Sequence, residues 1–430
     1  MKELMKKLGF GEKLSRNFLA IVIIAAGGTI IYYLPYFRYD YYDAYLSVYN
    51  LTNTQMGVFG SIYGVFGMIS YFFGGYLADK VSVRNILTIS LLGTGLGGFL
   101  HLLPLSFGWL CGLYAFWGFT SLFAFWPACV KATRIMSDQE DQGKAFGWFE
   151  GWRGVVSAIV APLAVLAYSM GVKKLGDDVN GMRYVIIFLS VLTCLIGIFV
   201  FFTTKNSIVA DEQKVSFKNL GEVLKLPAVW MVGMVTFCIY CFTMSIYYFV
   251  PYATSFLGMT VTVGALLAAF RRWLAPLSAF IGGHFVDKFG TSKVFLLGFI
   301  IPAIGTVVCL LFPHQASSII PYIIVYLVIY IFFNINYSLS WSMMEEGKIP
   351  EHLSGTAAGV ISTIGYLPEI FCSLLAGRLI DQSEGPTGYY YYFGFLVVMM
   401  IVGMVFVRLW KRYLDKINVA EPDAIAEIDA

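Results

Sequence analysis

The sequence contains few charged residues. Asp, Glu, Lys and Arg make up 13% of its 430 residues, whereas soluble globular domains contain about 25%. The formal net charge is only +3, and no face rich in Lys and Arg is present to bind a phosphate backbone. This composition argues against a soluble enzyme, a disordered chain and a nucleic-acid-binding protein.

Motifs for catalysis and for ATP-driven pumping are also absent. The four histidines fall at predicted helix ends or in loops, and no nucleophile–base or metal-ligand spacing occurs. No glycine-rich P-loop is present. The seven cysteines lie inside apolar runs, which disfavours disulfides and zinc sites. We therefore expect no enzymatic activity, no cofactor and no metal.

Apolar residues dominate the chain, at 58%, with 17% aromatics and 43 glycines. A membrane-spanning helix needs about 20 apolar residues. Apolar runs between polar breaks predict an all-α membrane protein with twelve transmembrane helices. Their approximate limits are 17–37, 55–78, 85–103, 108–136, 143–170, 183–203, 227–250, 260–286, 293–312, 318–346, 355–380 and 389–410.

The longest polar stretch, 204–226, divides the helices into two sets of six. It predicts one six-helix bundle over 17–203 and a second over 227–410, with a short N-terminal segment, 1–16, and a tail, 411–430. With this helix count, twenty basic residues fall on the side of the N-terminus and four on the other. The positive-inside rule then places both termini in the cytoplasm.

Two loops of the chain repeat each other. Gly74-Gly75-Tyr76-Leu77-Ala78-Asp79-Lys80 and Gly282-Gly283-His284-Phe285-Val286-Asp287-Lys288 are 208 residues apart. This repeat indicates that the chain consists of two copies of one six-helix unit. Such duplication is typical of transporters, whose binding site lies near the middle of the membrane between the repeats.

The first loop, Gly75-x-x-x-Asp79-Lys80-x-x-x-Arg84, resembles the loop signature of the major facilitator superfamily. Gly283-x-x-x-Asp287-Lys288 is similar to its second copy, and Ser82 departs from the usual glycine. The resemblance implies two pseudo-symmetric six-helix bundles that give alternating access to a central site. Trp126-Pro127-Ala128-Cys129 and Glu140-x-x-Gly143 further resemble the organic-anion branches of that family.

The loop residues are candidates for gating. Lys80 and Arg84 can reach acids such as Asp138 and Asp141, and contacts made in one conformation only would bias the equilibrium between states. The alternative is that these charges only fix the topology. The candidate gating residues are Gly75, Asp79, Lys80, Arg84, Asp287 and Lys288.

Five charged residues lie deep within predicted spans, where each costs at least ~2.5–3.5 kcal/mol if it faces lipid. They are Glu150, Arg153, Arg271, Arg272 and Glu369. At ~1.5 Å per residue, Arg153 and Arg271 lie near mid-depth. Two guanidiniums there would form an anion clamp, with Arg272 as a second choice.

Internal pairing is the alternative that stays open. Glu150 lies three residues from Arg153 on one helix face, and Glu369 could neutralise Arg271 or Arg272. Glu369 also follows Pro368, which frees backbone carbonyls. We expect Glu369 and Glu150 to carry the coupled proton. Tyr33, Tyr247 and Asn334 are the preferred further contacts to substrate.

The sequence thus predicts a monomeric secondary active transporter in the plasma (inner) membrane. Its expected partners are the lipid bilayer, a coupling ion and a small organic anion, either a sugar acid, carboxylate, sulfonate or phosphate ester. Proton-coupled symport by alternating access is the preferred mechanism. The alternatives are an efflux pump for hydrophobic compounds and an uncoupled uniporter or channel.

Overall fold

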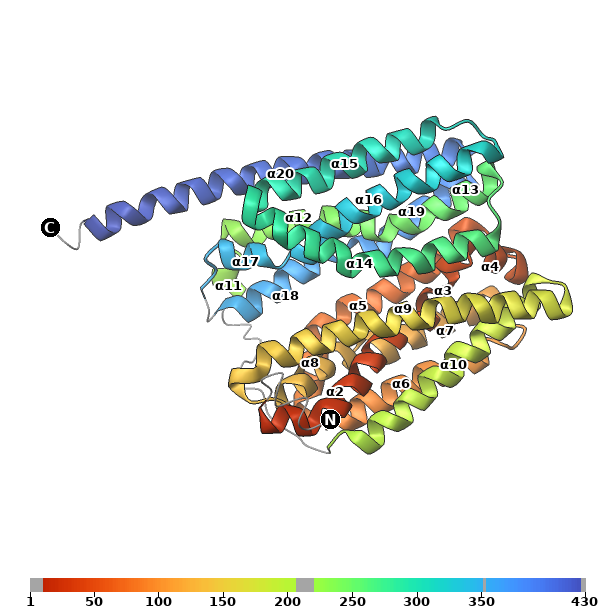
Figure 1. Cartoon of the computed structure of the whole chain (residues 1–430), viewed down its shortest axis with the longest axis horizontal. Coiled ribbons are helices and arrows are strands. Elements are labelled where there is room, and N and C mark those ends of the chain that lie inside the picture. The colour runs from red at the N-terminus through yellow and green to blue at the C-terminus, as the bar shows by residue number, and fades with distance from the viewer. Residues whose placement is uncertain (1–10, 206–219, 351–352, 427–430) are drawn as a thin grey trace. The chain divides into compact units, whose positions relative to one another are not determined.

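The computed structural model describes residues 11–205, 220–350 and 353–426, and in this part of the chain it consists of helices and their connections, without strands (Figure 1). Of residues 70–79 and 418–426, only the backbone is described. The chain folds into two compact units. Unit 1 comprises Met1–Glu212 with Thr260–Trp273, and unit 2 comprises Gln213–Met259 with Leu274–Ala430. The predicted bundle boundaries stay a prediction.

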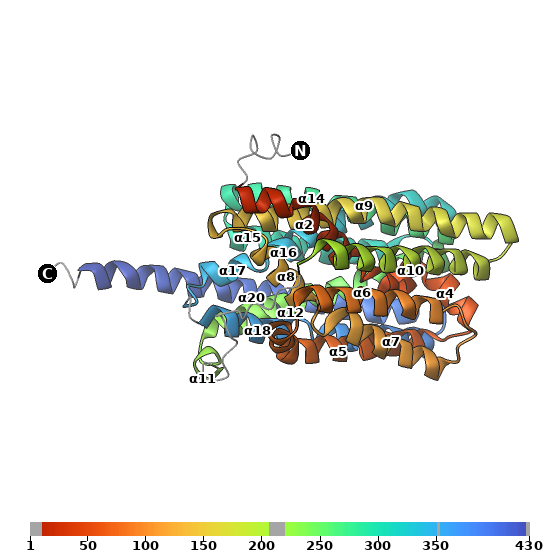
Figure 2. The same ribbon diagram turned by 90° about the horizontal axis from the view of Figure 1, so that it is seen from below.

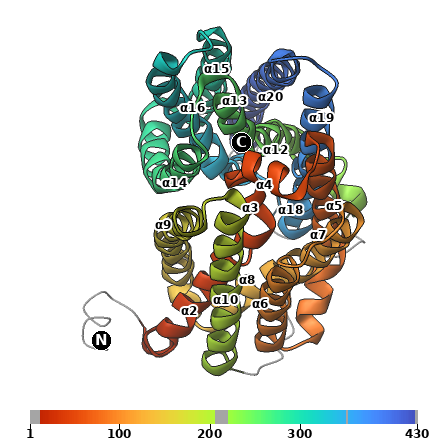
Figure 3. The ribbon, with the colours of Figure 1, turned by 90° about the vertical axis from the view of Figure 1, so that its right-hand side faces the viewer.

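The N-terminal part of unit 1 consists of helices gathered side by side and joined by connecting segments (Figure 3). They are α2 (Glu12–Ile30), α3 (Tyr33–Asp40), α4 (Tyr42–Tyr49), α5 (Asn53–Lys80), α6 (Val83–Leu100), α7 (Phe107–Leu122), α8 (Phe125–Ile135), the single turn η1 (Gln139–Asp141), α9 (Gln142–Leu175) and α10 (Asp178–Thr203).

Helix α14 (Val261–Phe289) contributes its first half to unit 1 and its second half to unit 2. The other helices of unit 2 are α11 (Leu220–Val223), α12 (Pro227–Ser245), η3 (Ile246–Tyr248), α13 (Phe249–Leu257), α15 (Thr291–Leu311), η4 (Ala316–Ser318), α16 (Ile319–Leu339), α17 (Ser342–Glu346), α18 (Ser354–Gly365), α19 (Pro368–Asp381) and α20 (Thr387–Ala426).

Eleven segments of the described chain are long and apolar enough to cross a membrane. Helix α5, with 28 residues, is the remaining predicted span. At ~1.5 Å per residue it is about 42 Å long, more than the ~30 Å hydrocarbon core. The described chain therefore provides eleven candidate spans, and α5 covers the predicted second span, 55–78.

Several predicted spans are broken in the middle. The first continues beyond residue 37 as α3, after a turn at Ile31–Tyr32. The fourth is divided between α7 and α8, and the seventh between α12 and α13. Hydropathy averaged over a window of about 19 residues does not locate such breaks, because it does not record local backbone geometry. Only the break between α18 and α19 was signalled in the sequence, by Pro368 at the start of α19.

Two helix ends follow from local chemistry. Gly176 closes α9 with φ of 85°, a left-handed conformation that favours glycine. The Asp177 side chain then caps α10 by accepting a hydrogen bond from the Asn180 N–H at 2.8 Å. This cap explains why α10 starts at Asp178, five residues before the predicted limit.

Each unit has an apolar interior. In unit 1, α2 packs on α9 and α6 packs on α10. Gly98 of α6 faces the Ser190 side chain so closely that a Cβ would not fit. In unit 2, α12 packs on α18, α19 and α20. Helix α20 extends well past its neighbour α15 at its C-terminal end (Figures 1 and 2).

Candidate functional site

A cluster of charged side chains forms within unit 1, where the first half of α14 meets the end of α3. Arg272 donates a hydrogen bond to Oδ2 of Asp40 at 2.5 Å. A terminal nitrogen of Arg271 lies 3.8 Å from Oδ1 of the same carboxylate. The side chain of Arg271 is 6% exposed and that of Asp40 is 14% exposed. Two consecutive arginines therefore share one largely buried acid.

Tyr33 contacts this cluster through Arg272. The guanidinium carbon of Arg272 is 4.5 Å from the centre of the Tyr33 ring, a cation–π contact. The Tyr33 hydroxyl donates to the Ser157 carbonyl of α9 at 3.1 Å and lies 3.2 Å from the Ser157 hydroxyl. Tyr33 thus orients Arg272 while itself being held from α9.

Arg153 forms a second group one helical turn from Ser157. It donates to both carboxylate oxygens of Glu150, at 2.9 and 2.7 Å, and its guanidinium carbon is 4.7 Å from the centre of the Trp126 ring. Its Nε is buried and has no hydrogen-bond partner in the part of the chain described. The local Glu150–Arg153 pairing that the sequence left open is therefore present. Ligand contact by Arg153 stays a prediction.

The two groups belong to one polar track along α9. Ser157, which binds Tyr33, follows Arg153 by four residues, which corresponds to about 6 Å along the helix axis. The Thr29 hydroxyl of α2 donates to the Arg153 carbonyl at 3.2 Å. The Glu150–Arg153 pair and the group of Tyr33, Arg272, Asp40 and Arg271 are therefore both held on α9 inside unit 1, about one helical turn apart.

A small hollow adjoins the cluster. Its wall includes the polar residues Tyr33, Asp40 and Tyr41, and the small side chains Ala161, Ala164, Ala265 and Ala269, together with Phe37, Val165 and Leu189. Its free space is enough for about one water molecule. An organic anion would need the hollow to widen.

Asp40 is absent from the residues predicted from the sequence. The predicted first span ended at residue 37, so Asp40 counted as a loop residue. In the structure α3 runs to Asp40, and Asp40 follows Tyr33 by seven residues, so both lie on one helix face. The sequence did contain an indication that the helix extends further, because the tyrosines Tyr32, Tyr33 and Tyr36 recur at helical spacing up to the predicted limit.

The remaining predicted binding and coupling residues lie in unit 2. Asn334 donates to the Ala275 carbonyl at 3.1 Å, and Tyr247 is half-buried in the single turn η3. Glu369 lies in the first turn of α19, where the helix N-terminus favours a carboxylate. Their contacts with substrate stay predictions.

The predicted gating residues are placed as follows. Gly75 and Asp79 lie in α5, but within the stretch whose side chains fall outside the described part of the chain. Lys80 ends α5 and is exposed, and the Arg84 guanidinium carbon lies 4.6 Å from the centre of the Phe201 ring. Asp287 and Lys288 are exposed near the end of α14. Their role in gating stays a prediction.

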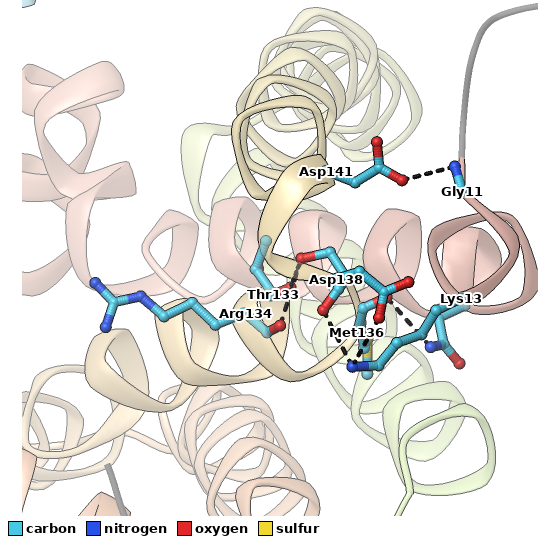
Figure 4. A network of polar contacts seen from close by, with 9 residues as sticks. Gly11, Lys13, Thr133, Arg134, Met136, Asp138 and Asp141 are labelled. Carbon is cyan, nitrogen blue, oxygen red and sulfur yellow. Dashed lines mark hydrogen bonds and ion pairs between the residues drawn. The ribbon is translucent and has the colours of Figure 1, made fainter. Parts of the chain in front are cut away.

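The acids between α8 and α9 bind the start of α2 (Figure 4). Asp141 accepts a hydrogen bond from the Gly11 N–H at 2.6 Å and one from Lys144 at 2.8 Å, while Asp138 lies 3.6 Å from Lys13. The Lys144 and Gly11 contacts hold the pKa of Asp141 below its usual value. This network ties the first turn of α2 to the α8–α9 connection.

Comparison with known proteins places these features in a family. Residues 17–373 match the family model "Major Facilitator Superfamily". Two Escherichia coli K12 relatives are each 28% identical: Inner membrane protein YihN over 91% of this chain and 94% of its own, and Inner membrane protein YqcE over 94% and 96%.

Solved structures show the same fold. A bacterial homologue of the human lysosomal transporter Spinster superimposes with a TM-score of 0.69 at 16% identity, covering 94% of this chain and 96% of that one. The nucleoside transporter NupG superimposes with a TM-score of 0.71 at 11% identity, covering 92% and 99%. The predicted all-helical membrane fold is confirmed. The chain belongs to the Major Facilitator Superfamily and is a multi-pass membrane transporter.

Proposed function

We propose that this transporter is a secondary active carrier of a small organic anion, a sugar acid, carboxylate, sulfonate or phosphate ester, coupled to protons. The proposal rests above all on Arg271 and Arg272, which approach a single carboxylate within a predicted membrane span. Their guanidiniums bring positive charge to this position, and the planar guanidinium fork suits carboxylate, sulfonate and phosphate groups.

Tyr33 adds selectivity to this site. Its ring holds Arg272, and its hydroxyl is already oriented by Ser157. A substrate bearing neutral hydroxyl groups next to its anionic group could therefore exchange hydrogen bonds with the tyrosine and serine hydroxyls. Sugar acids have this combination, which makes them the first compounds to test.

Proton coupling is assigned to Glu150 and Glu369. Protonation of Glu150 would remove the charge that holds Arg153, and would make that guanidinium available to an anion on the same polar track. Glu369 lies beside the α18–α19 break, where free backbone groups can line a water-accessible path. Alternating access would then follow from anion and proton binding to one conformation more tightly than to the other.

The proposal also includes the setting of the protein. We place it as a monomer in the plasma (inner) membrane with both termini in the cytoplasm, which the distribution of basic residues supports. Gating by the residues of the two repeated loops belongs to the same proposal.

The test begins with purified wild-type protein and a thermal-stabilisation screen over sugar acids, sugar phosphates, dicarboxylates and sulfonates. The best compound is then followed in proteoliposomes with an imposed pH gradient. We expect accumulation that a protonophore abolishes, and an Arg272→Gln variant should bind at least about tenfold more weakly, a loss of ~1.4 kcal/mol. Uptake unaffected by the protonophore would favour the uniporter. Stabilisation by hydrophobic compounds alone would favour the efflux pump.

A further inference from the structure

The Asp40 carboxylate is an imperfect partner for the two arginines that hold it. Its Oδ2 accepts from Arg272, but its Oδ1 is buried without a hydrogen bond, and the Arg271 nitrogen is 3.8 Å away. Hydrogen bonds between nitrogen and oxygen require about 2.7–3.2 Å. The Asp40 carboxylate therefore makes one close hydrogen bond within this arginine pair and leaves its own Oδ1 unsatisfied, whereas a larger oxyanion can offer three oxygens.

A second unsatisfied group lies next to it. The Tyr41 hydroxyl is buried and has no hydrogen-bond partner in the described part of the chain. Tyr41 follows Asp40 in the chain, and both residues line the hollow. Buried hydroxyls normally have partners, so this donor indicates that the hollow receives a polar group.

These donors can be considered as one oxyanion seat, made of Arg271, Arg272 and the Tyr41 hydroxyl. We infer that the Asp40 carboxylate occupies the oxyanion seat as a built-in competitor, which a transported anion displaces when it binds. This inference rests on the proposed function, and it assigns specificity to Asp40 and Tyr41. Anions that span both guanidiniums and reach Tyr41 displace Asp40, while small monodentate anions do not.

Displacement also explains why the hollow can be small at rest. Asp40 forms part of its wall, which also includes alanines of α9 and α14. When the carboxylate rotates away, the space that it held joins the hollow. Without substrate Asp40 thus offsets part of the positive charge of the two arginines, which limits the cost of placing guanidiniums inside a membrane span.

The test uses inorganic sulfate as the probe, with wild type and variants compared at constant ionic strength by intrinsic fluorescence. We expect Asp40→Asn to bind sulfate at least about tenfold more tightly than wild type, because the competitor is gone. Asp40→Glu keeps a carboxylate and Asp43→Asn removes one three residues away. Both controls should stay within about threefold of wild type.

Two further variants locate the effect. Adding Arg272→Gln to Asp40→Asn should abolish the gain, and adding Tyr41→Phe should reduce it by about threefold or more. A gain that survives Arg272→Gln would place sulfate elsewhere and overturn the inference. If Asp40→Asn does not fold, Asp40→Ser replaces it in the experiment. If neither variant folds even in the presence of sulfate, the inference is also overturned, because bound sulfate should then take the place of the carboxylate and stabilise the protein.

The outcome separates this inference from the proposed function. If organic anions bind wild type but Asp40→Asn shows no gain for sulfate, the competitor role is wrong and the carrier proposal stands. If sulfate gains affinity in Asp40→Asn while no organic anion binds or is transported by wild type, the seat exists and the proposed cargo is wrong.

Discussion

The two arginine groups of unit 1 differ in how they are held. Arg153 pairs with Glu150 on its own helix, three residues away, and the Glu150 side chain is 54% exposed. Arg272 pairs with Asp40, 232 residues away, and the Asp40 side chain is 14% exposed. The Glu150–Arg153 pair needs only the geometry of one helix to form, and its exposed carboxylate can leave the arginine without disturbing the packing of other helices. The distant pair exists only when the chain is folded, and we expect the removal of its largely buried acid to cost more stability than the removal of Glu150.

The largest effect should come from breaking the distant pair. Asp40→Ala leaves two guanidiniums without their shared carboxylate, and breaking a buried pair costs about 3–5 kcal/mol. We expect a loss near the lower end because Asp40 is not fully enclosed. Thermal unfolding in detergent without added oxyanion measures it. A loss no greater than that of Glu150→Ala would remove the contrast between the two groups.

An intermediate effect should follow from removing the support of Arg272. Tyr33→Phe loses the hydrogen bond to Ser157 but keeps the ring, so it should cost about 1 kcal/mol. Tyr33→Leu also removes the cation–π contact, with a further loss of about 0.5–1 kcal/mol. The difference between the two variants in unfolding experiments isolates the ring. Equal losses would show that the ring does not hold the guanidinium.

A smaller effect should come from the local pair. Glu150→Gln removes an exposed i,i+3 ion pair, and such pairs contribute about 0.5 kcal/mol or less. Stability should therefore hardly change, while coupling should. In proteoliposomes the variant should still exchange anions across the membrane, yet lose accumulation driven by a pH gradient. A strongly destabilised variant, or one with intact accumulation, would contradict this assignment.

The smallest effect at neutral pH concerns the network at the start of α2. The pKa of Asp141 is lowered in the folded state by Lys144 and Gly11. Its stabilising contribution is therefore present above the unfolded pKa, about 3.9, and is lost as pH falls through the folded value. Asp141→Asn should flatten the acid limb of a stability–pH curve without changing the anion affinity measured at pH 7. An unchanged acid limb would contradict this.

The sequence predicted the helical membrane fold well because each span is a long apolar run. It drew attention to Arg153, Arg271, Arg272 and Tyr33, since charges and tyrosines within such runs are conspicuous, and their role in binding stays a prediction. It missed Asp40 because the end of a helix is set by local backbone geometry, which hydropathy does not record. It also could not choose the partner of Arg272, because a contact over 232 residues depends on how helices pack.

The central claim is that the arginines of α14 hold a transported anion. Its most direct test is equilibrium binding of the organic anion that best stabilises wild type, measured on wild type, Arg272→Gln and Arg153→Gln. We predict a loss of about tenfold or more for Arg272→Gln and a smaller loss for Arg153→Gln. Unchanged affinity in Arg272→Gln, with the variant folded, would contradict the account.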